Sequence, residues 1–239
     1  MSDESIERQL RQEMVLVGKL LHQKGYVAAT DGNISVRWGE DRVMVTPSGM
    51  SKGFMSPDEM IVTDLEGRVL SGEGRGAAKP SSEFPLHLQA YRQRPDIRAV
   101  VHAHPPVAIA CSVAGFSLEM CVIPEVVVTL GSIPTTPYAT PGTPEGAEVI
   151  RDLIRTRDAL LLDHHGVVAV GASAMDAYLK LEKVEHAAQI ILTARQLGRV
   201  TPLTPAQVDK LIEIRRRHGL LREGDEEALR RLAAQPTPF

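Results

Sequence analysis

Two pairs of histidines in this chain have the spacing of metal ligands. His102 and His104 lie at the end of an apolar run, and residues i and i+2 of a β-strand point to the same face. His164 and His165 end a second apolar run, just before Gly166. Because neighbours on a strand point in opposite directions, we expect only one histidine of the second pair to face a metal. The pattern alone does not select which one.

Three imidazoles around one ion describe a catalytic zinc rather than a structural zinc. A structural zinc is normally closed by four protein ligands, often thiolates, whereas a catalytic zinc keeps one position open. Cys111 and Cys121 have the wrong spacing for a structural site, and we expect both to be buried thiols. The histidine pattern therefore favours a catalytic divalent metal.

Three short polar segments could bind an anion near these histidines. Ser81 and Ser82 precede Glu83 at the expected start of a helix, where free N–H groups and the helix dipole favour negative charge. The loops 31–33 and 46–49 combine glycine with Asn or Ser, which suits close approach to a phosphate. Each segment alone is also typical of an ordinary helix cap or turn. Their occurrence together favours a phosphate site.

The elements that must position these residues alternate between helices and strands. The apolar spacing of Ile6, Leu10 and Met14 predicts a first helix that Gly25 ends. We expect one α/β domain over residues 1–239, in which the tail from about 222 is a short peripheral helix or a frayed end. Strands are expected at 33–37, 42–46, 60–63, 68–70, 98–104, 126–130, 159–163 and 167–170, and further helices at 81–94, 106–113, 144–155, 173–197 and 204–218, with a Gly-rich stretch at 71–76.

Composition excludes several classes of partner. The chain has 27 basic and 30 acidic side chains and a net charge of −3, which leaves no basic excess for nucleic acid or an anionic membrane. Hydrophobic residues make up 43% and charged residues 24%, as in ordinary globular proteins. The N-terminus lacks the layout of a signal peptide, and no run of ~18 apolar residues occurs. We expect a soluble, cytoplasmic protein.

Taken in order, these motifs resemble the class II aldolase/adducin family. The similarity runs from the first helix to about Gly219 and is greatest to the L-fuculose-1-phosphate aldolase branch. It implies a three-layer α/β/α domain with a central, mostly antiparallel sheet, assembled as a ring-like homotetramer with active sites between subunits. The segments that carry the resemblance are Gly32–Ser35, Thr46–Gly49, Pro80–Glu83, His102–His104 and His164–Gly166.

The resemblance also implies roles for single residues. Zn²⁺, or another divalent metal such as Mn²⁺ or Co²⁺, would be held by His102, His104 and His165, since the family's ligand immediately precedes the glycine. Glu83 corresponds to the family's catalytic carboxylate. The substrate phosphate would be held by Asn33, Ser48, Gly49, Ser81 and Ser82, with Gly32 shaping the first loop.

The implied reaction is cleavage of a ketose 1-phosphate, similar to L-fuculose 1-phosphate, to dihydroxyacetone phosphate and an aldehyde through a metal-stabilised enediolate. Alternatives on the same scaffold are a decarboxylase or dehydratase acting on a sugar-acid or methylthioribulose phosphate, or an epimerase. Epimerase relatives typically carry Asp where this chain has Glu83. A noncatalytic module, as in adducin, is an alternative of another class, but its head domain lacks the zinc histidines that this chain keeps.

The family's aldehyde-side tyrosines have no counterpart here. Ile123–Glu125 lies near the first tyrosine position, and His218 takes the second. His218 or a residue of a neighbouring subunit could donate the proton on this side, and His218 could equally be a cation near a helix C-terminus.

Several other polar residues fit structural roles better than catalytic ones. We expect His87 to pack or hydrogen-bond rather than to bind metal. Glu185 is expected on a solvated or subunit-facing side of its helix, and Arg215–Arg217 at a solvated helix end.

Overall fold

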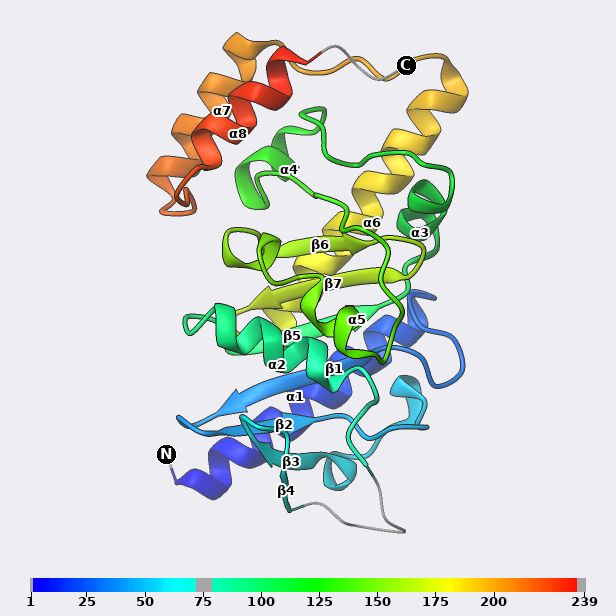
Figure 1. Cartoon of the computed structure of the whole chain (residues 1–239), viewed down its shortest axis with the longest axis vertical. Helices are drawn as coiled ribbons and strands as arrows, with labels where there is room; N and C mark the ends of the chain where they lie inside the picture. Colours follow the sequence, from blue (N-terminus) through cyan, green and yellow to red (C-terminus); the bar gives the residue numbers. More distant parts are fainter. Residues whose placement is uncertain (1, 72–78, 236–239) are drawn as a thin grey trace.

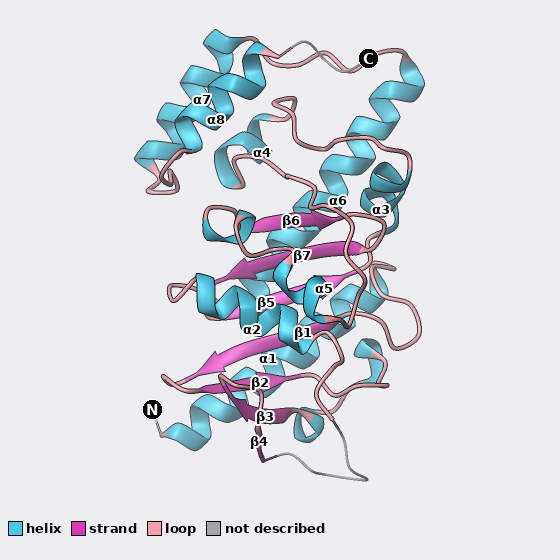
Figure 2. Cartoon of the chain, viewed as in Figure 1, coloured by secondary structure: helices cyan, strands magenta, loops and turns pink. Residues whose placement is uncertain are grey.

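A computed structural model describes residues 2–71 and 79–235 of the chain. A seven-stranded sheet, in the order β4-β3-β2-β1-β5-β7-β6, lies between two layers of helices (Figures 1 and 2). All its neighbouring strands pair antiparallel, which confirms the predicted three-layer α/β/α fold with a mostly antiparallel sheet. The strands are β1 Asn33–Trp38, β2 Arg42–Val45, β3 Ile61–Asp64, β4 Val69–Ser71, β5 Ala99–Ala103, β6 Ala159–Leu162 and β7 Gly166–Gly171.

Helices cover both faces of the sheet. The helices α2 and α5 lie on one face, and α1, α3 and α6 lie on the other (Figure 1). No helix in the described part of the chain is long and apolar enough to span a lipid bilayer. The helices are α1 Asp3–Gln23, α2 Phe84–Gln93, α3 Pro106–Val113, α4 Pro124–Thr129, α5 Pro144–Glu148, α6 Ala174–Leu197, α7 Pro205–Arg217 and α8 Asp225–Ala234, with short 3-10 turns η1 Lys52–Phe54, η2 Pro57–Glu59 and η3 Leu153–Arg155.

Alternation of side chains along the strands builds a separate core on each face of the sheet. On β5, Ala99 and Val101 join the core under α1 and α6, while Val100 joins the core under α2. His102 therefore shares the face of Val100 and points to the side of α2. This places the histidine on the same side of the sheet as the helix that follows Glu83.

A third, smaller core joins α4 to the C-terminal helices. Cys121, Val127 and Leu229 are among its buried members, and Cys111 lies in the main core, so both thiols are free and buried as predicted. The tail expected from about residue 222 contains α8. The first residue of α8, Asp225, is 1% exposed and accepts hydrogen bonds from Arg157 and Arg215.

This pairing corrects one expectation about the basic end of α7. Arg216 and Arg217 are exposed, as expected, but Arg215 is 3% exposed and its guanidinium lies 2.8 Å from the Asp225 carboxylate. A buried charge needs a partner of opposite sign, and Asp225 lies ten residues further along the chain. The contact between Arg215 and Asp225 therefore could not be predicted from the periodicity of the sequence.

Two expected elements differ from the structure. The valine-rich segment expected as a strand at 126–130 belongs to α4, because Pro124 takes a first-turn helix position and Val127 packs against α7 and α8. The helix expected over 144–155 ends at Glu148 and continues as a turn and η3. There the Arg94 guanidinium donates to the backbone carbonyl of Ile154. Most of the Gly-rich stretch at 71–76 lies outside the described residues.

Candidate functional site

Three histidines from the sheet converge on one point. His102 lies on β5, His104 follows that strand, and His165 precedes β7, which pairs with β5. The three ring centroids lie 5.0, 4.7 and 5.1 Å apart, and the Nε2 atoms of His102 and His104 are separated by 3.1 Å. Tetrahedral metal–nitrogen bonds of about 2.0–2.1 Å require nitrogens roughly 3.3 Å apart. The spacing fits a single metal ion.

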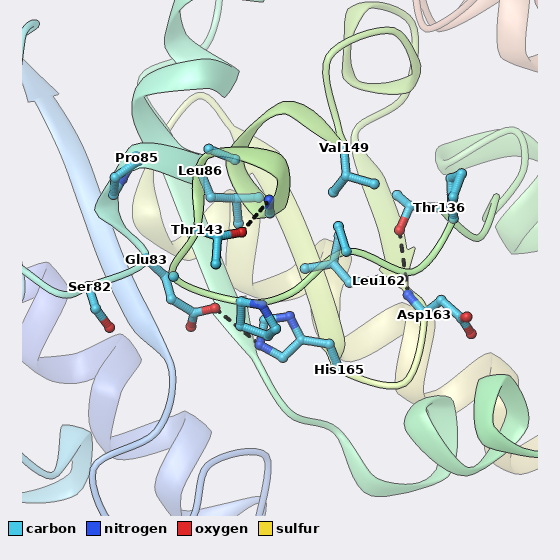
Figure 3. A pocket seen from close by; sticks show the side chains of 16 residues that line it. Ser82, Glu83, Pro85, Leu86, Thr136, Thr143, Val149, Leu162, Asp163 and His165 are labelled. Atoms are coloured by element: carbon cyan, nitrogen blue, oxygen red, sulfur yellow. Dashed lines mark hydrogen bonds and ion pairs between the residues drawn. The ribbon is translucent and has the colours of Figure 1, made fainter.

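Glu83, just before α2, completes this cluster from the helix layer that His102 faces. Its two carboxylate oxygens lie 3.2 Å from Nε2 of His102 and 3.1 Å from Nε2 of His165. Figure 3 shows the Glu83 carboxylate directed at His165. One ligand atom from each of Glu83, His102, His104 and His165 lies within 4.8 Å of the other three. Three imidazoles and one displaceable carboxylate suit a catalytic divalent metal.

The outer nitrogens of two histidines are oriented by further contacts. Nδ1 of His102 is 3.0 Å from the carbonyl oxygen of Val167, and Nδ1 of His104 is 3.5 Å from the Asp31 carboxylate. An oxygen acceptor at Nδ1 holds the proton there and leaves the Nε2 lone pair for a metal. The four donor groups of the cluster and this tautomer preference are both suited to binding a metal ion.

Gly166 is a requirement of this geometry. A Cβ atom on it would lie 2.5 Å from the carbonyl oxygen of Ala103 and 2.9 Å from ring atoms of both His102 and His104. Contacts this short do not occur for real Cβ atoms. The glycine after the second histidine pair therefore lets β7 approach β5 at the cluster.

Burial and the imidazoles act in opposite directions on Glu83. Burial raises the pKa of its carboxyl group, but His102 and His165 lower it more, and the net pKa lies well below its usual range. Burial, with the two neighbouring imidazoles, lowers the pKa of His104 to about 4. At neutral pH the site thus presents a carboxylate and, at His104, a neutral imidazole, which are the protonation states of metal ligands.

The residues that we expect to bind phosphate lie around the start of α2. Ser48 N–H donates to the Lys79 carbonyl at 2.9 Å, and Asn33 Nδ2 donates to Ser81 Oγ at 3.0 Å and to Glu83 Oε2 at 3.4 Å. The amide oxygen of Asn33 is buried and has no hydrogen-bond partner among the described residues. Ser48 and Ser82 are exposed to solvent. The polar loops therefore lie next to the metal cluster.

Two glycines shape these loops. Gly32 has φ +70°, and a Cβ atom there would lie 2.6 Å from Val27 and 2.9 Å from the His102 carbonyl oxygen. Gly49 has φ +72° with open space around it, so it needs glycine for its backbone conformation alone. Helix α2 begins at Phe84, later than predicted, because Ser81 Oγ accepts the Glu83 N–H in the preceding turn.

Only one histidine of the second pair belongs to the cluster, as predicted. The pair lies in the turn between β6 and β7, where His164 takes φ +56°, is exposed and contacts the Asp163 carboxylate at 3.0 Å. His165 is directed at Glu83 instead. The turn thus separates the side chains of His164 and His165, as a continuing strand would.

His218 lies outside this assembly. It is exposed at the C-terminal end of α7, a helix that packs on α4 and α8. Ile123 caps the start of α4, which places both counterparts of the family's tyrosines in the α4/α7 region of the chain.

Sequence patterns did not find the contacts that hold Glu83 in place. His87 Nδ1 lies 2.7 Å from Ser35 Oγ, which lies 2.9 Å from the Tyr91 hydroxyl, and all three side chains are buried. These hydrogen bonds link α2, just after Glu83, to β1, and they confirm a hydrogen-bonding role for His87. The expectation that Glu185 lies on a solvated or subunit-facing side of its helix is wrong. Its carboxylate is buried within the chain and accepts hydrogen bonds from the N–H groups that open α3, just after His104.

A pocket extends from the cluster toward the loop before α5 (Figure 3). Glu83 and His165 form one end, and Leu86, Val149 and Leu162 supply apolar surface. Its lining among the described residues contains the acidic Glu83 and Asp163 but no Lys or Arg. The pocket thus offers apolar surface next to the metal-binding groups.

Comparison with known proteins identifies the family to which this chain belongs. The model of the Class II Aldolase and Adducin N-terminal domain matches residues 12–192. This chain belongs to the class II aldolase and adducin family. The match includes every residue of the metal cluster and of the polar loops described above.

Two similar proteins of this family are lyases. The chain is 34% identical to the 3-oxo-tetronate 4-phosphate decarboxylase of Haemophilus influenzae over 203 residues, 83% of this chain and 93% of that protein. It is 33% identical to the L-fuculose phosphate aldolase of Methanococcus maripaludis over 178 residues, 74% and 93% of the two chains. The expected enzyme class, a metal-dependent lyase, is confirmed.

Solved structures agree with this assignment. The crystal structure of YgbL from Klebsiella pneumoniae matches with a TM-score of 0.78 at 32% identity, covering 86% of this chain and 98% of that one. The L-fuculose-1-phosphate aldolase of Thermus thermophilus matches with a TM-score of 0.70 at 31% identity, covering 81% and 98%.

Proposed function

We propose that this chain is a Zn²⁺-dependent aldolase that cleaves a ketose 1-phosphate, similar to L-fuculose 1-phosphate, to dihydroxyacetone phosphate and an aldehyde. The observation that carries the proposal is the contact of one carboxylate, Glu83, with two of three converging imidazoles. An acid–base group next to a metal site is what carbon–carbon cleavage beside a carbonyl requires.

His102, His104 and His165 would hold the metal, and the ion supplies Lewis-acid stabilisation of the negative charge that develops on the substrate's carbonyl oxygen. Cleavage breaks the bond between carbons 3 and 4, and the electron pair stays on carbon 3 as an enediolate. The hydroxyl on carbon 4 gives up its proton as the aldehyde forms, and carbon 3 takes up a proton. Glu83 is placed to exchange a proton with carbon 3, because its carboxylate already lies at the metal ligands.

The polar loops would hold the other end of the substrate. Asn33, Ser81 and Ser82 lie at the start of α2 with Glu83, and the loop at Ser48 and Gly49 lies against the same segment. Binding a phosphate there fixes the end that does not react, and so positions carbon 3 near Glu83.

The pocket beside Glu83 would take the aldehyde half. Its lining carries two acidic residues, Glu83 and Asp163, and no cation among the described residues. The apolar side chains of Leu86, Val149 and Leu162 in this lining fit a neutral aldehyde fragment, which favours the aldolase over an acid decarboxylase.

Decarboxylation is the second candidate, because of the relative from Haemophilus influenzae. Loss of CO₂ from a 3-oxo-tetronate 4-phosphate leaves an electron pair on the carbon beside the ketone, and one proton converts that fragment to dihydroxyacetone phosphate. Both reactions therefore need the same metal site, the same phosphate site and the same proton transfer by Glu83. They differ in whether an aldehyde or CO₂ leaves.

A substrate panel tests the proposal directly. Purified enzyme loaded with Zn²⁺ is given L-fuculose 1-phosphate, 5-deoxy-D-ribulose 1-phosphate and a 3-oxo-tetronate 4-phosphate, and dihydroxyacetone phosphate, aldehyde and CO₂ are each measured. We expect aldehyde from a ketose 1-phosphate, with kcat/KM at least about tenfold above that for release of CO₂. Release of CO₂ as the faster reaction would assign the chain to the decarboxylases, and no product from any of the three would contradict both candidates.

A further inference from the structure

We propose that Lys52 provides the positive charge that makes the pocket of Asn33, Ser48, Gly49, Ser81 and Ser82 select a phosphate, while joining the two loops that form it. The inference rests on the proposed function, because it concerns the same pocket. Lys52 opens η1 and is 1% exposed, so its ammonium group lies inside the protein.

The contacts of Lys52 connect two loops that are separate in the sequence. Its Nζ donates to the carbonyl of Thr30 at 2.9 Å and also to the carbonyl of Met50. Thr30 immediately precedes the loop that contains Gly32 and Asn33, and Met50 immediately follows Ser48 and Gly49. One ammonium group therefore bridges the two loops.

The backbone at Lys52 is packed tightly against a helix. Helix α1 lies directly against Lys52: a Cβ atom at Gly18 would be 2.5 Å from the Lys52 carbonyl oxygen and 2.7 Å from the methyl carbon of Met55. The absence of a side chain at Gly18 allows this close packing. Lys52 is thus held between a helix and the two loops.

A buried ammonium is a costly way to join two carbonyl groups. Burial lowers the pKa of Lys52 to about 8, and the nearby Asp31 carboxylate acts in the opposite direction. Lysines are almost never fully buried without a charged partner, and neutral donors could bridge two carbonyls at lower cost. The positive charge itself therefore needs an explanation.

An anionic ligand supplies that explanation. The carboxylates of Asp31 and Glu83 both lie by the metal histidines, at 3.5 Å from His104 and 3.2 Å from His102. A phosphate monoester carries nearly two negative charges at neutral pH and would be repelled by them. A cation inside the protein is screened by salt much less than one on the surface, so Lys52 can offset this repulsion.

Three variants separate charge from simple support of the loops. Lys52→Met removes both the charge and the hydrogen bonds, Lys52→Gln keeps hydrogen-bond donors without the charge, and Lys210→Met removes an exposed charge on α7 as the control. Thermal unfolding checks that each variant is folded. The readouts are the Kd of inorganic phosphate by titration calorimetry, metal content, and kcat and KM for a ketose with and without its phosphate.

We expect Lys52→Gln to weaken phosphate binding about tenfold and Lys52→Met by about 30-fold or more, as for loss of a charge-assisted interaction. Metal content and the unphosphorylated ketose's kcat/KM should stay within about threefold, and Lys210→Met should match the wild type. Phosphate binding within twofold of wild type in a folded Lys52→Gln variant would overturn the proposal. So would an equal loss for both ketoses. The binding readout does not depend on turnover, so a wrong reaction assignment leaves this test intact.

Discussion

Replacement of Glu83 by Gln is expected to lower kcat by at least about 100-fold while the enzyme keeps its metal. General acid–base groups typically contribute 10²- to 10⁴-fold to rate, and an amide cannot exchange a proton with carbon 3. The three imidazoles remain in the variant, so binding of the metal does not need the carboxylate. Steady-state kinetics on the best substrate of the panel, together with elemental analysis, measure both quantities.

The matched control for this variant is Glu227→Gln, an exposed glutamate on α8. It should keep wild-type kinetics. Near-normal turnover of the Glu83→Gln enzyme would refute the proton-transfer role. Loss of metal together with turnover would show instead that Glu83 is a permanent ligand.

Replacement of His102 by Ala is expected to remove most of the bound metal and all measurable lyase activity. The imidazole is fully buried, lies 3.1 Å from His104 and 3.2 Å from Glu83, and keeps the Val167 carbonyl paired. Two remaining imidazoles make a much weaker site than three. We expect less than about one tenth of the wild-type metal per chain after dialysis, measured by elemental analysis.

His186→Ala is the control, since this histidine is exposed on α6. It should retain wild-type metal and activity. His104→Ala gives an independent check, because His104 is 24% exposed and its loss disturbs the core less. Unchanged metal content in folded variants of both His102 and His104 would count against the ligand set.

Much of the fold follows from local patterns in the sequence. The hairpin of β1 and β2, the strand that carries His102 and the long helix α6 were all predicted, because side-chain periodicity and helix caps such as Ser173 specify them. Helix α4 was wrongly predicted as a strand. Its valines favour strand structure locally, and only their packing against α7 and α8 decides for a helix.

Some residues of the site could likewise be predicted from the sequence, and others could not. Spacing alone brought His102 and His104 to one face, whereas the choice of His165 over His164 needed the resemblance to a known family. Lys52 could not be found from the sequence, because a lysine in a polar loop is typical of a solvated residue. Its contact with Thr30 joins residues that lie 22 positions apart. Contacts of this kind depend on the folded arrangement of the loops.

In the proposed mechanism, His102, His104 and His165 hold one divalent ion beside Glu83. Anomalous diffraction at the zinc absorption edge, from crystals of the Zn²⁺-loaded enzyme, tests this ligand set. We expect one peak per chain, bonded to the three Nε2 atoms, with the remaining coordination exchangeable for an enediolate mimic such as phosphoglycolohydroxamate. A peak elsewhere, no peak at these histidines, or an ion closed permanently by four protein ligands would contradict it.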